Sequence, residues 1–110
     1  MVMTFLLAGL ESMALNGGPP FTHSIGMSIV IRCETQAEID EYWEKLSEGG
    51  QKVQCGWLTD KFGVSWQIVP TVLQDLAGDP DPAKSQSVMR AMLQMKKLDI
   101  AKLQQAYDAA

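Results

Sequence analysis

Apolar and polar residues alternate along three stretches of the chain, which predicts strands at Ile25–Cys33, Cys55–Thr59 and Val64–Val69, with a turn at 60–63 between the last two. Successive side chains of a strand point to opposite faces of its sheet. The face expected to form the core carries Met27, Ile29, Ile31, Cys33, Val64, Trp66 and Ile68. The other, mixed face carries Ser28, Val30, Arg32, Ser65, Gln67 and Val69.

The N-terminal stretch Val2–Leu7 is apolar and predicts a further strand. Ala8–Glu11 is expected to turn, and Ser12–Asn16 is expected to return as a second strand. Residues 16–20 are predicted to be a loop, because their two glycines and two prolines do not suit a strand ladder.

The segment Thr35–Glu48 is predicted to be a helix that begins with a capping box formed by Thr35 and Glu38. Apolar residues then follow at helical spacing, and this stripe is expected to face the core rather than a ligand. The stripe consists of Ile39, Tyr42, Trp43 and Leu46. Gly49 and Gly50 are expected to end the helix.

The pattern after residue 70 is helical. A short helix is predicted at Thr71–Ala77, a second at about 82–97 with Asp81 as its N-cap, and a third that is capped by Asp99. The methionines of the second helix either fill gaps in the core or form a plastic docking surface, and core packing is the favoured interpretation.

The 110 residues suffice for one domain with a real core, since 46% are hydrophobic and 20% are charged. The formal net charge is −4 and the pI is about 4.8, which disfavours binding to nucleic acid or to an anionic membrane. The one basic cluster, Lys96-Lys97, is expected to lie at a helix end against the negative end of the helix dipole.

The N-terminal MVMTFLLAGL is apolar, but it is not expected to be a signal peptide, since no Lys or Arg precedes it and no A-x-A site follows it. The stretch is also far too short to span a bilayer. The sequence therefore predicts a cytoplasmic protein.

Two cysteines, Cys33 and Cys55, are too few for a disulfide scaffold, and neither CxxC nor a Cys/His zinc spacing occurs. We expect two free, partly buried thiols, while a disulfide stays open because both residues lie at ends of predicted strands. The chain has one histidine and no nucleophile elbow, so no familiar catalytic triad is recognised. The acidic residues of the 35–48 helix are expected to form a solvated face.

Four segments, in this order, resemble the PhnB-like family of the glyoxalase/bleomycin-resistance/dioxygenase (vicinal oxygen chelate) superfamily, also labelled 3-demethylubiquinone-9 3-methyltransferase domains. They are MALNGGPPF (13–21), RCETQAEIDEYWEKLSEGG (32–50), CGWLTDKFGVSWQIVPTVL (55–73) and AMLQMKKLDIAKLQQAY (91–107). The resemblance implies an α+β fold of two βαβββ modules whose curved mixed sheets enclose a cavity. Within a single domain, residues 25–70 would then be the second module, 1–20 the last two strands of the first module, and 71–110 C-terminal helices.

The resemblance also implies that the first strand and helix of the first module are missing, which predicts a truncated protein or gene model. Members of the family often assemble as dimers with shared or exchanged elements. Since a half-built sheet exposes edges and apolar surface, we expect a homodimer.

Metal-dependent members of the superfamily hold a divalent ion with His and Glu or Gln side chains. By resemblance, the histidine of the second module falls at about Ser28 and its glutamate at Gln67, and a first-module glutamate falls near Ser12 or Met13. Hydroxyl and amide groups replace imidazole and carboxylate poorly, so no metal is expected. No glycine-rich loop opens a helix, so no nucleotide-type cofactor is expected either. His23, in a loop, is either a displaced ligand or acid/base group or, as favoured, a surface residue.

Polar groups on the mixed faces of the predicted strands are expected to line a cavity for a small organic ligand. The candidates are Asn16, Ser28, Arg32, Trp57, Ser65 and Gln67. Arg32 would favour an anionic or carbonyl-rich ligand. A filled barrel interior with satisfied polar groups is the open alternative.

Three functions stay open from the sequence. The favoured one is metal-independent binding of a small organic molecule within a dimer, with no reaction assigned. The others are a non-enzymatic dimerisation module with a vestigial cavity, and a metal-dependent lyase or dioxygenase completed by a partner chain. His or Glu at positions 28 and 67 would have supported the last of these.

Overall fold

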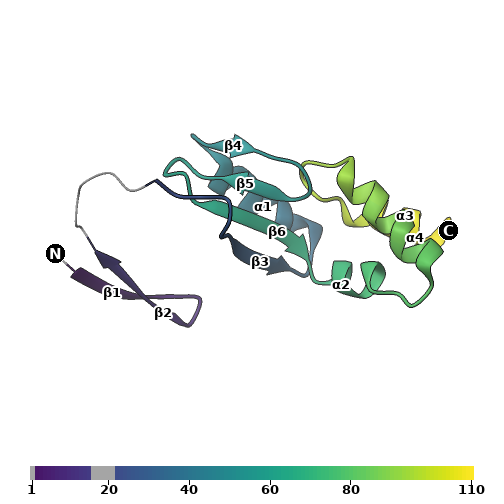
Figure 1. The fold of residues 1–110 in the computed structure, drawn as a ribbon, viewed down its shortest axis with the longest axis horizontal. Helices are drawn as coiled ribbons and strands as arrows, with labels where there is room; N and C mark the ends of the chain where they lie inside the picture. The colour runs from purple at the N-terminus through teal and green to yellow at the C-terminus, as the bar shows by residue number, and fades with distance from the viewer. Residues whose placement is uncertain (1, 16–21) are drawn as a thin grey trace.

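The computed structural model describes residues 2–15 and 22–110. Its centre is a mixed four-stranded sheet in the order β3-β6-β5-β4 (Figure 1). The strands are β3 (Ile29–Cys33), β4 (Gln51–Lys52), β5 (Trp57–Thr59) and β6 (Ser65–Pro70). β3 runs parallel to β6, whereas β4, β5 and β6 pair antiparallel. Helix α1 (Gln36–Ser47) joins β3 to β4, so the predicted order of strand, helix and three strands and the α+β class are confirmed.

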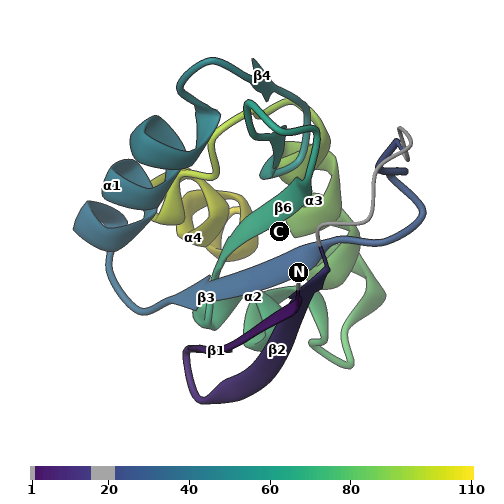
Figure 2. The same ribbon diagram turned by 90° about the vertical axis from the view of Figure 1, so that its left-hand side faces the viewer.

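Helix α1 covers one face of the sheet (Figure 2). Its Thr35 cap accepts a hydrogen bond from the N–H of Glu38 at 3.2 Å, and the Thr35 hydroxyl donates to the Glu38 carboxylate at 3.3 Å. Tyr42 is 41% exposed, so the predicted apolar stripe is wrong at this position. The core between α1 and the sheet consists of Cys33, Ile39, Trp43, Leu58 and Ile68.

The register of the strands sorts their side chains onto two faces. Gln67 of β6 pairs with Val30 of β3 and with Trp57 of β5, and paired residues share a face. Ile68 and Leu58 lie on the opposite face, under α1, which confirms the predicted alternation in β6. We call the sheet face opposite α1 the distal face. It carries Val30, Arg32, Trp57, Thr59, Ser65, Gln67 and Val69.

β3 is shorter than the predicted strand, because it begins at Ile29 rather than at Ile25. The residues before it form a turn in which the N–H of Met27 donates to the carbonyl of Ser24 at 3.5 Å. Ile25 and Met27 are 74% and 81% exposed, so the prediction that Met27 belongs to the core is wrong.

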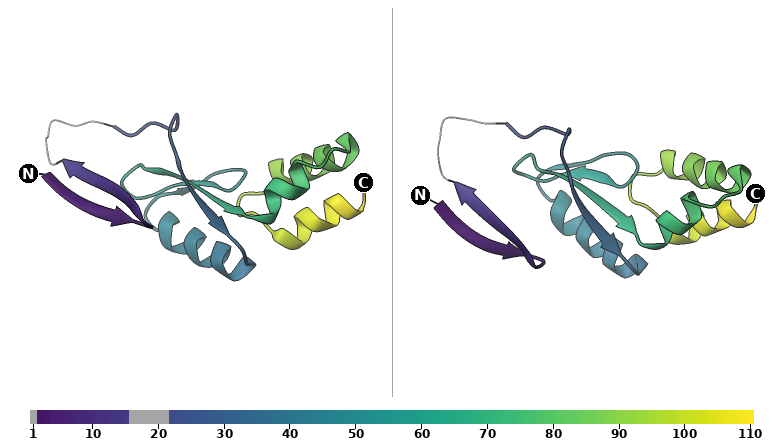
Figure 3. Two further views of the ribbon diagram at one scale, coloured as in Figure 1. Left: turned by 90° about the horizontal axis from the view of Figure 1, so that it is seen from below. Right: turned by 60° about the horizontal axis from the view of Figure 1, so that its bottom comes forward.

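A separate two-stranded hairpin precedes this sheet and consists of β1 (Val2–Leu7) and β2 (Leu10–Leu15) (Figures 1 and 3). Its turn is Ala8-Gly9, and both residues have left-handed backbone with φ of 50° and 84°, which is typical of a tight hairpin turn. The prediction that the return strand begins at Ser12 is therefore wrong. Its predicted end at Asn16 lies outside the described residues.

Three helices follow β6 at one end of the sheet (Figure 1): α2 (Val72–Ala77), α3 (Pro82–Leu93) and α4 (Ile100–Asp108). Leu76, Val88 and Leu103 of these helices form a second core together with Leu98, which lies between α3 and α4. Met92 and Met95 are half-buried against this core, which confirms core packing for these two methionines. Because α3 ends at Leu93, Lys97 does not lie at a helix end as predicted, and it instead forms an ion pair with Asp40 of α1 at 2.9 Å.

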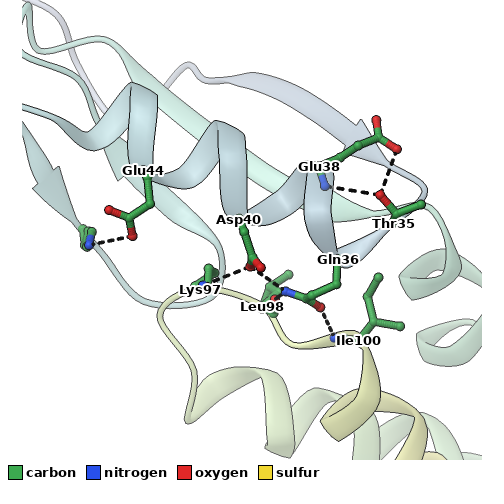
Figure 4. A network of polar contacts seen from close by, with 9 residues as sticks. Thr35, Gln36, Glu38, Asp40, Glu44, Lys97, Leu98 and Ile100 are labelled. Carbon is green, nitrogen blue, oxygen red and sulfur yellow. Dashed lines mark hydrogen bonds and ion pairs between the residues drawn. The ribbon is translucent and has the colours of Figure 1, made fainter.

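The segment Met95–Ile100 connects α3 to α4 and is held against α1 (Figure 4). We call this segment the strap. The Gln36 side-chain amide of α1 donates to the carbonyl of Leu98 at 3.0 Å and accepts from the N–H of Ile100 at 2.8 Å. A side-chain amide thus satisfies two backbone groups of the strap in the way that a neighbouring strand would.

The strap is also held from its other side. The N–H groups of Cys55 and Gly56 donate to the carbonyls of Met95 and Lys96, each at 2.8 Å. Both donors have left-handed backbone, with φ of 62° and 82°. β5 therefore begins at Trp57, and the prediction that it begins at Cys55 is wrong.

We expect Gly56→Ala to destabilise the fold by about 2–5 kcal/mol, because left-handed backbone and a crowded Cβ both oppose alanine. A Cβ at this position would lie 2.9 Å from the Ile68 carbonyl oxygen and 3.0 Å from Leu98 Cδ1. Gly63→Ala is the matched control, since φ of Gly63 is +86° but the atom nearest to an added Cβ, the Cβ of His23, is 4.0 Å away. The free energy of unfolding of this control should fall only by the cost of left-handed backbone for alanine, about 1–2 kcal/mol. Urea unfolding measures both, and equal losses would contradict the packing argument.

Candidate functional site

The centre of the distal face holds a hydrogen-bonded pair of neutral polar side chains. The amide Nε2 of Gln67 donates to Ser28 Oγ at 2.8 Å. Ser28 immediately precedes β3, and Gln67 is the third residue of β6. The resemblance assigns metal ligands to these two positions, and the structure places them side by side. After this bond, Gln67 still has its carbonyl oxygen as an acceptor and Ser28 its hydroxyl proton as a donor.

Two hollows lie on the distal face, on either side of this pair along β6. One has a volume of about 320 Å³, lies between the sheet and helices α2 and α3, and is lined in part by Arg32. The other, of about 310 Å³, is lined in part by Trp57 and Ser65. We call them the helix-side hollow and the turn-side hollow. The structure thus brings five of the predicted site residues to one face, where Arg32 lines one hollow and Trp57 and Ser65 line the other. Ser28 and Gln67 line neither hollow.

The predicted site residues differ in what they can offer a ligand. Ser65 is 1% exposed, and its Oγ has no hydrogen-bond partner within the described part of the chain. Trp57 and Gln67 are half-buried, whereas Arg32 is exposed. Asn16 lies outside the described residues.

Several residues of the helix-side hollow were not among the predicted site residues. Helices α2 and α3 contribute Leu73, Gln74, Ala77, Met89 and Met92. No local pattern places these residues beside Arg32, because their proximity depends on how the C-terminal helices pack on the sheet. The sequence held one hint of this lining, because a docking surface was the alternative interpretation for the methionines of the second C-terminal helix.

The turn between β5 and β6 is organised by the carboxylate of Asp60. It accepts hydrogen bonds from the N–H groups of Phe62 (2.9 Å) and Val64 (3.0 Å) and from the indole N–H of Trp66 (3.0 Å). Burial acts to raise the pKa of Asp60, but the three hydrogen bonds outweigh it and hold the pKa below its ordinary value. His23 is exposed and lies beside this turn, as the surface interpretation predicted.

No group of three or more His, Cys, Asp or Glu side chains that could hold a metal ion occurs within residues 2–15 and 22–110. Both cysteines are free, with Cys33 buried and Cys55 half-buried. Burial, followed by the charge of Glu38, raises the pKa of the Cys33 thiol and so disfavours its reactive thiolate. Within the described part of the chain, no helix has the length and apolar character that crossing a membrane requires.

Comparison with known proteins identifies similar domains. A family model described as 3-demethylubiquinone-9 3-methyltransferase matches residues 1–69. A putative 3-demethylubiquinone-9 3-methyltransferase, PhnB protein, from Bacillus cereus is 35% identical with a TM-score of 0.60, and the match covers 64% of each chain. Protein PA1353 from Pseudomonas aeruginosa shares the fold at 24% identity and a TM-score of 0.54, over 64% of this chain and 62% of that one. The matched part is thus less than two thirds of either relative, and no curated protein matches.

We expect Asp60→Asn to lower the free energy of unfolding at pH 7 by about 1–3 kcal/mol, because an amide replaces one of two charged acceptors. The folded-state pKa is depressed, so the carboxylate contributes fully above its unfolded pKa of about 3.9 and loses its contribution as the pH falls through the lower folded value. The difference between wild type and variant should therefore shrink below about pH 4.

Urea unfolding at pH 7 and pH 3 checks this expectation for Asp60. Asp75→Asn, at an exposed position of α2, is the control and should change stability little at either pH. A loss for Asp60→Asn that is the same at both pH values would contradict the role of the ionised carboxylate.

Proposed function

Because the chain belongs to the 3-demethylubiquinone-9 3-methyltransferase family and is PhnB-like, we propose that it binds a small organic molecule on the distal face of its sheet, without a metal ion. In this proposal, a second copy of the chain completes the cavity. The observation that carries the proposal is the Ser28–Gln67 pair, which lies between two hollows of one sheet face. The proposal assigns no reaction.

The chemistry of the pair suits a neutral polar group of a ligand. The carbonyl oxygen of Gln67 can accept from a ligand hydroxyl, and the proton of Ser28 can be donated to a ligand carbonyl. Neither side chain is anionic, so the pair supplies no charge to balance a divalent cation. Val30 and Trp57, which flank Gln67 in register, add apolar surface for the carbon skeleton of the ligand.

The family description names a methyl transfer, whose methyl donor would need a binding site of its own. Nucleotide-type cofactors approach the start of a helix through a glycine-rich turn. Two connections in the described chain lead directly from a strand into a helix, namely Glu34-Thr35 before α1 and Thr71 before α2, and neither contains glycine. The residues present do not fit such a cofactor, and the proposal includes no methyl transfer.

A second copy is proposed because the β1–β2 hairpin is apolar on both of its faces. Phe5 and Leu7 lie on one face and Leu6 on the other, and they are 43%, 41% and 73% exposed. A two-stranded hairpin is marginally stable alone in water, so these side chains need a covering surface. Among the described strands, β3 is an edge of the larger sheet and offers backbone groups for pairing with another chain. Exchange of hairpins between two copies would cover both features.

We expect light scattering coupled to size-exclusion chromatography to show a dimer, and we expect Phe5→Glu to weaken it at least about tenfold, because burying an unpaired carboxylate is costly. The matched control is Phe62→Glu, since Phe62 is 72% exposed in the β5–β6 turn, and this variant should dimerise like wild type. A folded monomeric wild type, or a Phe5→Glu dimer of unchanged affinity, would argue against the second copy.

The metal-free part of the proposal is tested by metal content. The chain is incubated with Mn²⁺, Ni²⁺ and Zn²⁺, dialysed and analysed by mass spectrometry with inductively coupled plasma. We expect far less than one retained ion per chain, since Ser28 and Gln67 are poor ligands for these ions. One ion per chain that is lost in Gln67→Ala would show that the pair binds metal and would sink this part of the proposal.

A further inference from the structure

The helix-side hollow is an open depression bordered by four elements, β3, β6, α2 and α3, at one end of the distal face. Its volume of about 320 Å³ lies near the lower end of the range for small-molecule pockets. Its lining is mostly apolar and includes Val30, Val69, Leu73, Ala77, Met89 and Met92. Methionine side chains are flexible, so the wall contributed by α3 can adapt to the shape of a ligand.

Among the described residues that line this hollow, Arg32 is the one charged side chain, and Thr71 and Gln74 are the neutral polar ones. Arg32 lies on β3 beside Val69 of β6, so its side chain starts from the distal face. No carboxylate of the described residues lies within 4.0 Å of its guanidinium. The hollow therefore joins an apolar wall to a cation that has no anionic partner in the described chain.

We propose that the helix-side hollow selects an amphiphilic monoanion, which is a small molecule with a compact apolar body and one carboxylate or similar group held by Arg32. The inference rests on the proposed function, because it names the class of ligand for the same sheet face. A guanidinium presents two parallel N–H donors to a carboxylate, which gives both attraction and orientation. The apolar body covers the surface of Val30, Val69 and the methionines, which is otherwise exposed to water.

Octanoate and 1-octanol test the inference, because both carry an eight-carbon chain and differ in the head group. Their affinities for the whole 110-residue chain are measured by isothermal titration calorimetry at pH 7, where the carboxylate is ionised. We expect octanoate to bind about tenfold more tightly than 1-octanol. Arg32→Gln should remove this preference and leave 1-octanol binding unchanged.

Two variants serve as controls for Arg32. Arg32→Lys keeps the positive charge and should retain part of the preference for octanoate. Arg90→Gln removes the other arginine of the chain, which is exposed on α3 outside the lining of the hollow, and it should retain all of the preference.

A third variant, Val30→Trp, tests whether the hollow is the binding site. It fills the hollow from a strand position that is 48% exposed, and it should abolish binding of both compounds.

The outcomes separate the inference from the proposed function. Equal affinities for the two compounds, or a preference that survives Arg32→Gln, would overturn the anionic ligand class but leave small-molecule binding at the distal face. Binding of both compounds that persists in Val30→Trp would place them elsewhere and overturn the hollow as their site. Failure of wild type to bind either compound would overturn the inference, whereas the proposed function, which rests on the Ser28–Gln67 pair, is decided by its own tests of dimerisation and metal content.

Discussion

The contact between Gln36 and the strap is the interaction on which the arrangement of the sheet and the C-terminal helices depends. One side-chain amide satisfies two backbone groups of the strap, and the left-handed turn at Cys55-Gly56 satisfies two more from the other side. Leu98, within the strap, is fully buried in the helical core. The strap thus ties α1, the sheet and α2–α4 into one unit. In this unit α2 and α3 lie next to β3 and β6, and the helix-side hollow lies between these elements.

In β6, adjacent residues face opposite sides of the sheet, so the core and the candidate site lie one residue apart in the sequence. Ile68 is fully buried under α1, and its neighbour Gln67 lies on the distal face, so a register shift of one residue in β6 would exchange them. Asp60 opposes such a shift, because its carboxylate holds the turn backbone and the Trp66 side chain together. The acidic residue of the turn therefore positions the amide of the site without touching it.

Most of the local structure was predictable from the sequence because it depends on local chemistry. The caps at Thr35, Asp81 and Asp99 and the alternation in β6 required only spacing and residue type, and all are observed. The starts of β2 and β5 were mispredicted because Ala8 and Cys55, just before these strands, have left-handed backbone. Alanine and cysteine rarely adopt this conformation, so the sequence gives no reason to expect it there.

The site was predictable only in part, for a different physical reason. The alternation of side chains along the predicted strands placed Arg32 and Gln67 on the mixed faces, and the register of β3 and β6 confirms that both lie on one face of the sheet. The division of this face into two hollows depends on helices that are distant from these strands in sequence. Core packing was the favoured interpretation for Met92, and only the tertiary arrangement shows that this residue also lines a hollow beside Arg32.

The acidity of the chain does not conflict with an anionic ligand. The net charge of −4 acts at long range, where salt at physiological concentration screens it over about 8 Å. At contact distance, the charge that a ligand in the helix-side hollow meets is that of Arg32, since the other described residues that line it are uncharged. Ser28 and Gln67 are neutral and so add hydrogen bonds without opposing charge. The distal face therefore separates the two parts of recognition, with hydrogen-bond direction at its centre and charge at its helical end.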